Sequence, residues 1–90
     1  MNEPLAIRRK RLLHRSRYRG RLEGDLLLGR FAARHLARLD RADLDRYEAL
    51  LGESDQDLFD WISGRAPVPA RHDHELFRRL RTFRPIDAQD

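Results

Sequence analysis

Apolar side chains recur every three or four residues along most of this chain, and no stretch alternates polar and apolar residues for long enough to form a strand. β-Branched residues are rare, and 90 residues leave room for one small domain. The sequence therefore predicts an all-α fold, a compact five-helix bundle. We expect a single helical domain over residues 1–90, ordered from about 4 to 84, with a flexible tail at 85–90.

Residues that start and stop helices divide the chain into five segments. Asp40 and Ser54 are typical N-caps, and Leu39 with Leu44 occupies the two positions of a hydrophobic staple. Glycine or proline follows most of the apolar patterns. The expected helices run from Pro4 to Arg17, Leu22 to Leu39, Asp40 to Gly52, Ser54 to Gly64, and Ala70 or Asp73 to Phe83.

The chain contains no cysteine, which excludes disulfide scaffolds, cysteine zinc sites, iron–sulfur ligation and cysteine nucleophiles. Its longest aliphatic run is Leu26–Leu28, whereas a membrane span needs about 20 apolar residues. We therefore expect no membrane insertion. Residues 1–20 lack the apolar core of a secretory signal, and small secreted domains usually need disulfides. These features predict a cytoplasmic protein.

Charge is unevenly distributed along the chain. The net charge is +4, yet residues 1–21 carry +7, residues 40–60 carry −6 and residues 71–84 carry +3. Arginine supplies 18 of the 19 basic residues and makes planar, bidentate contacts with carboxylates and phosphates. The basic first segment leaves open a small nucleic-acid-binding or antitoxin-like regulatory protein. The acidic middle disfavours that alternative, because nucleic-acid binding prefers a broad positive surface.

The chain offers few groups for catalysis. His72 and His74 flank one aspartate, but residues two apart on a helix do not face each other. We expect a solvated helix start there, with a metal site as the minor alternative. His35 is expected at the surface or boundary of the fold, and Trp61 in the core. No catalytic residue, bound cofactor or metal is predicted.

The junction between the first two helices is the candidate site. Arg17, Arg19 and Gly20 are followed by Glu23 and Asp25 in the first turn of the next helix, where the helix dipole favours negative charge. One interpretation is an ordinary glycine turn with an Arg19–Glu23 pair. The other is an exposed turn that presents a patch of mixed charge to a partner.

Two motifs resemble those of a known family. Arg19-Gly20-x-x-Glu23 resembles the RGxxE signature of the SdhE (flavinator) family, the assembly factors of succinate dehydrogenase. The stretch from Asp55 to Ile62, DQDLFDWI, is similar to that family's D-x-D-L-F-x-W-hydrophobic pattern. The resemblance covers roughly Leu5 to Phe83. Tyr18 and Gly24 depart from it, since relatives often carry arginine and an apolar residue there.

This resemblance implies a function in flavoprotein assembly. Family members bind the flavoprotein subunit of succinate dehydrogenase, and in some bacteria that of fumarate reductase, and promote covalent attachment of FAD to it. The attachment chemistry lies in the flavoprotein, so the resemblance implies a chaperone-like partner and not an enzyme. Carried over to this chain, Arg19, Gly20 and Glu23 would form the partner-binding turn, with Asp25 and Arg17 beside it. We expect a monomer.

Overall fold

The computed structural model describes residues 3–19 and 22–83, together with the side chains of all of these except 22–25. Within those ranges the chain forms five α-helices and no strand, which confirms the predicted all-α class. The helices are α1 (Leu5–Arg17), α2 (Leu22–His35), α3 (Arg41–Leu51), α4 (Asp55–Ser63) and α5 (Glu75–Thr82). The predicted tail at 85–90 lies outside the described residues.

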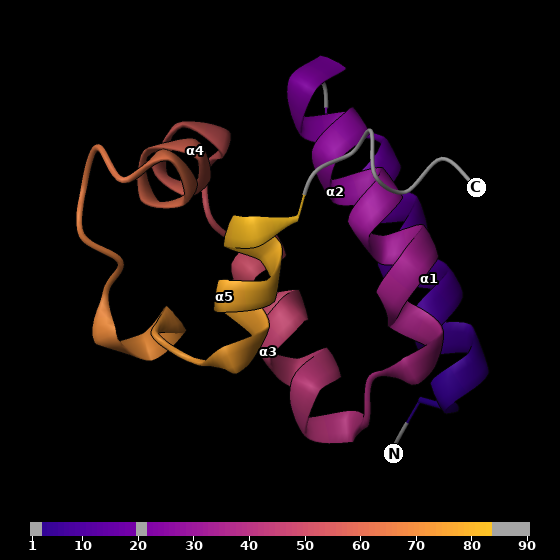
Figure 1. The fold of residues 1–90 in the computed structure, drawn as a ribbon. Helices are drawn as coiled ribbons and strands as arrows, with labels where there is room; N and C mark the ends of the chain where they lie inside the picture. The colour runs from indigo at the N-terminus through magenta and orange to yellow at the C-terminus, as the bar shows by residue number, and fades with distance from the viewer. Residues whose placement is uncertain (1–2, 20–21, 84–90) are drawn as a thin grey trace.

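The helices pack in two groups (Figure 1). α1 and α2 lie side by side and antiparallel, and α3 runs beside α1. α5 packs on both α3 and α4 and so joins the second half of the chain to the first. Within the part of the chain that is described, no helix is both long and apolar enough to cross a lipid bilayer.

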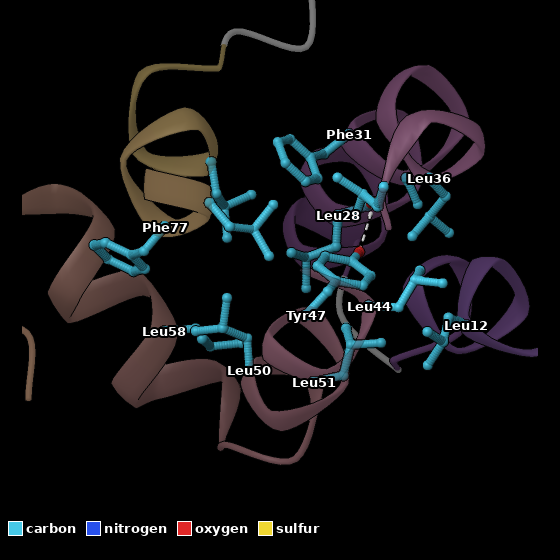
Figure 2. Close-up of a cluster of buried hydrophobic side chains, with 14 of the residues drawn as sticks. Leu12, Leu28, Phe31, Leu36, Leu44, Tyr47, Leu50, Leu51, Leu58 and Phe77 are labelled. Carbon is cyan, nitrogen blue, oxygen red and sulfur yellow. Dashed lines mark hydrogen bonds between the residues drawn. The ribbon is translucent and has the colours of Figure 1, made fainter. Parts of the chain in front are cut away.

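The core lies where these helices meet, around the buried ring of Tyr47 (Figure 2). Its hydroxyl shares a 2.5 Å hydrogen bond with the buried hydroxyl of Ser16 and lies 3.4 Å from the carbonyl oxygen of Leu28. One polar cluster at the centre of the core therefore joins α1, α2 and α3. The surrounding apolar side chains come from all five helices and include Leu12, Phe31, Leu36, Leu44, Leu50, Leu51, Leu58 and Phe77.

Local caps set the helix ends where the sequence predicts them. The Asp40 side chain accepts a hydrogen bond from the amide of Asp43 at 2.8 Å, and Ser54 accepts from Asp57 at 3.1 Å. Gly64 ends α4 in the left-handed conformation, with φ of 83°. These caps are confirmed because each depends only on residues within three positions of the helix end.

Two helices are shorter than the sequence predicts. α2 ends at His35 rather than Leu39, and a 3-10 turn (Leu36–Arg38) follows it. The carbonyl oxygen of Leu36 in this turn accepts a hydrogen bond from the Arg9 side chain at 3.0 Å. The last predicted helix is likewise split. A 3-10 turn (Ala70–His72) precedes α5, which begins only after His74, whose Nδ1 accepts from the amide of Phe77 at 3.1 Å. The imidazole thus replaces a more usual N-cap.

Candidate functional site: the Arg19 turn and the α3–α4 loop

Arg19 follows the end of α1 and reaches across to the loop between α3 and α4. Its Nε donates to Oδ1 of Asp55 at 2.6 Å, and its two terminal nitrogens donate to the carbonyl oxygens of Leu51 and Glu53 at 2.9 and 2.8 Å. Only 10% of the Arg19 side chain is exposed. Arg19 therefore holds the turn against its own protein, and most of its guanidinium is unavailable to a partner.

This contact joins the two sequence motifs. Arg19 begins the RGxxE stretch and Asp55 begins the D-x-D-L-F-x-W stretch, 36 residues later. Asp55 also sits in the first turn of α4, where the helix dipole favours its negative charge. This role of Asp55 is not predicted by the sequence. The interaction of Asp55 and Asp57 with the helix dipole explains acids at these positions without any further contact. No local sequence pattern indicates a contact between residues 36 positions apart.

The other predicted site residues surround this anchor. Arg17 is exposed at the end of α1, and its stem passes close to Gly29, where a built Cβ would lie 3.1 Å from Arg17 Cγ. Glu23 and Asp25 lie in the first turn of α2, but their side chains are outside the described part of the chain. The predicted Arg19–Glu23 pair and the conformation of Gly20 are outside it as well.

Tyr18 is a further candidate that the motif does not include. It lies between Arg17 and Arg19 and is 71% exposed, the largest exposure among the described large apolar side chains. Its ring centroid lies 4.6 Å from that of His14, one turn earlier on α1. Exposed tyrosine beside arginine is typical of protein-binding surfaces. The sequence signal was an aromatic residue in a run of charges next to a glycine.

The α3–α4 loop also holds the segment before α5. The carboxylate of Glu53 accepts from Nε2 of His72 at 2.7 Å and from the Arg71 guanidinium at 2.8 Å. Hydrogen bonding to His72, and then to Arg71, lowers the pKa of Glu53. The prediction that His72 lies in a solvated helix start is wrong, because its ring is buried beside Trp61, 5.5 Å between centroids. Trp61 is in the core, as predicted.

The hydrogen bonds of His72 and His74 do not prepare them as a pair of metal ligands. Nε2 of His72 is already engaged by a carboxylate, so only its Nδ1 remains for a metal. His74 accepts through Nδ1, so its Nε2 carries the proton and offers no lone pair to a metal. Both of these outer nitrogens are buried, and neither has a hydrogen-bond partner among the described residues. The described residues contain no group of three histidine or acidic side chains that could hold a metal ion.

Several basic residues of the first segment are neutralised by α3. Arg8 contacts Asp45 at 2.6 Å and Glu48 at 2.9 Å, and Arg11 contacts Glu48 at 3.1 Å. The hydrogen bond from Arg11, followed by that from Arg8, lowers the pKa of Glu48. The most basic and most acidic segments of the sequence therefore pair with each other. This pairing weakens the nucleic-acid interpretation, because those arginines are engaged within the fold.

Comparison with known proteins identifies the family. A family model described as the flavinator of succinate dehydrogenase matches residues 10–84, a range that contains both motifs. The chain belongs to this flavinator family. The prediction of that family from the two motifs is confirmed.

Curated relatives agree with the family match. The chain is 42% identical over 87 residues to succinate dehydrogenase assembly factor 2, mitochondrial, from Candida glabrata, covering 92% of this chain and 57% of the relative. Proteins of the same name from Aedes aegypti and Culex quinquefasciatus are 43% and 42% identical over 82 residues, covering 89% of this chain and 51% and 52% of theirs. The chain thus spans slightly more than half the length of these relatives.

The same relatives overturn one prediction. The lack of cysteine and of a secretory signal predicts a cytoplasmic location. These flavinator relatives are named as mitochondrial proteins, which contradicts that location.

Proposed function

We propose that this chain is an assembly factor for succinate dehydrogenase that binds the flavoprotein subunit and promotes covalent attachment of FAD to it. The observation that carries the proposal is the flavinator match over residues 10–84. The chain acts as a monomeric binding partner, and the bond to FAD forms within the flavoprotein. The matched relatives bear the name of this assembly role, which supports its coarser part.

The geometry at the end of α1 suits a docking surface. Three hydrogen bonds hold the Arg19 side chain, so that side chain has little conformational freedom left to lose when a partner binds. Arg17 and Tyr18 lie exposed beside it. Glu23 and Asp25 follow in the first turn of α2 and supply negative charge for cations of the partner. We therefore assign binding to Arg17, Tyr18, Gly20, Glu23 and Asp25, with Arg19 as their support.

The direct test is co-expression with the flavoprotein subunit of succinate dehydrogenase in cells that lack their own assembly factor. Covalent flavin is read from in-gel fluorescence of the denatured flavoprotein. The expected result is a clear gain in fluorescence over the empty vector, with equal amounts of flavoprotein on the gel. No gain with a soluble, folded chain would refute the proposal.

The site is tested by a pair of matched variants. Glu23→Ala removes an acid from the first turn of α2, and Glu75→Ala removes one from the first turn of α5, far along the chain. Both changes lose a similar interaction with a helix dipole. We expect Glu23→Ala to abolish most of the flavin signal while Glu75→Ala retains it, with both variants folded by circular dichroism. Equal activity of the two would show that the turn is not the binding site.

A further inference from the structure

A shallow apolar groove runs between α1 and α2 on their outer side. Its volume is about 170 Å³, enough for the branched end of one aliphatic side chain. The small side chains of Ala32, Ala33 and Ala37, on α2 and the 3-10 turn after it, keep the groove open. Two leucines also line it, and an arginine and a lysine of α1 lie along one side. The lining residues are Arg9, Lys10, Leu13, Ala32, Ala33, Leu36 and Ala37.

Exposed side chains of the same two helices lie beside the groove. Among the described residues, the exposed large apolar side chains are Ile7, Tyr18 and Leu26, and all three belong to α1, its end, or α2. At 100° per residue, Leu26 and Ala33 share one face of α2, and Lys10 and Arg17 share one face of α1. We call the surface formed by Lys10, Arg17, Leu26, Ala33 and Ala37 the α1–α2 face.

The charge on this face is positive, and no acid of the described part of the chain pairs with it. The sequence has no acidic residue at positions 4–22 or 26–39. Three arginines of α1, Arg8, Arg11 and Arg15, pair with acids of α3, and Arg11 also pairs with Glu3. Lys10 and Arg17 are exposed and have no acidic partner among the described residues. Arg9 is held by the carbonyl oxygens of Leu36 and Leu39 at 3.0 and 2.8 Å.

We propose that the α1–α2 face binds an acidic segment of the partner protein, which places one aliphatic side chain in the groove and carboxylates beside Lys10 and Arg17. The inference rests on the proposed function and extends the binding surface from the turn at residues 20–25 along the two helices. Charge complementarity selects the occupant, because an apolar groove with unpaired cations favours an aliphatic side chain flanked by acids.

Lys10 makes a direct test possible because it is the only lysine in the chain. A carbodiimide joins an amine to a carboxylate only when the two are in contact. In the complex with the flavoprotein subunit, we expect a zero-length cross-link from Lys10 to an aspartate or glutamate of the partner, identified by mass spectrometry. Lys10→Arg keeps the positive charge, so it should retain binding and lose this cross-link. Cross-linking only through the N-terminal amine would overturn the proposal.

A second test fills the groove. Ala33 is exposed on α2, so Ala33→Trp should occupy the groove without disturbing the core, and Ala49→Trp places the same side chain on an exposed position of α3. We expect Ala33→Trp to weaken binding of the flavoprotein subunit by about tenfold or more, the effect of losing one buried anchor. Ala49→Trp should leave the affinity within about twofold. Equal affinities of the two folded variants would overturn the proposal.

The outcomes separate this inference from the function on which it rests. If the wild-type chain raises covalent flavin but neither Lys10 nor Ala33 responds as expected, the function stands and the α1–α2 face is not its binding surface. If the wild-type chain does not bind the flavoprotein subunit, both fail. Cross-linked dimers of this chain in the absence of the partner would assign the face to a second copy and overturn the proposal. Binding to phosphatidylglycerol vesicles that Ala33→Trp abolishes would assign the face to lipid and overturn it as well.

Discussion

Nε of Arg19 and Oδ1 of Asp55 lie 2.6 Å apart, and both side chains are largely withdrawn from solvent, with 10% and 15% exposed. The contact connects the end of α1 to the start of α4. The family motif leads us to expect that Arg19 contributes to partner binding, and this stays a prediction. The structure adds an internal role, since the guanidinium binds the α3–α4 loop while Arg17 and Tyr18 beside it are exposed.

The first prediction concerns this ion pair. Asp55→Asn removes the charged acceptor and should lower the free energy of unfolding by about 1.5–3 kcal/mol, the range for hydrogen bonds to charged groups. Asp57→Asn is the matched control, because it removes an exposed acid from the same turn of α4. It should change stability by no more than about 0.5 kcal/mol. Urea unfolding of both variants measures the difference, and equal losses would mean that the pair contributes nothing beyond the helix dipole.

The second prediction concerns the buried hydroxyl pair of Ser16 and Tyr47. Tyr47→Phe and Ser16→Ala should each cost about 1–2 kcal/mol, since each leaves a buried hydroxyl with fewer partners. The double variant should cost less than the sum of the two, because the shared hydrogen bond is lost only once. Strictly additive losses in urea unfolding would show that the two hydroxyls act independently.

The third prediction concerns the cap of α5. Burial, and then the nearby charges of Arg46 and His72, lower the pKa of His74. As the pH falls, His74 is therefore protonated in the unfolded chain before it is protonated in the folded protein. Neutral His74 thus contributes its full stabilisation of the fold above pH 6.5, and this contribution declines as the pH falls below that value. His74→Asn keeps an acceptor for the amide of Phe77 but does not titrate. Its stability should decline less than that of wild type between pH 7 and 5.

His35 also contributes to the pH dependence of stability, and it is unchanged in the His74→Asn variant. Burial, followed by the charges of Arg34, Arg79 and Arg38, lowers the pKa of His35 as well. Its contribution has the same sign, so His74→Asn should retain part of the dependence on pH. An unchanged slope in the variant would show that His74 does not titrate with the cap.

The parts of the fold that follow from neighbouring residues could be predicted from the sequence. Asp40 and Ser54 cap the helices that they precede, and Gly64 ends the helix before it. His35 lies at the boundary of the fold, half-buried between Phe31 and Phe83, as expected. In each case the deciding interaction is local or follows from helical periodicity.

The features that depend on distant residues could not be predicted in this way. The burial of His72 depends on Trp61 and on the carboxylate of Glu53, and the position of Arg19 depends on Asp55. Spacing along the chain carries no information about these contacts. The two motifs of the family were visible as separate stretches, but their meeting in space was not.

The loop that connects α3 to α4 therefore holds two distant segments together. The backbone oxygen of Glu53 accepts a hydrogen bond from Arg19, and its carboxylate accepts from Arg71 and His72. One residue thus contacts both the first third and the last third of the chain. Cutting or lengthening the chain at this point would disturb both contacts together. A chain without cysteine thus uses one short loop to hold the end of α1 and the segment before α5 at the same time.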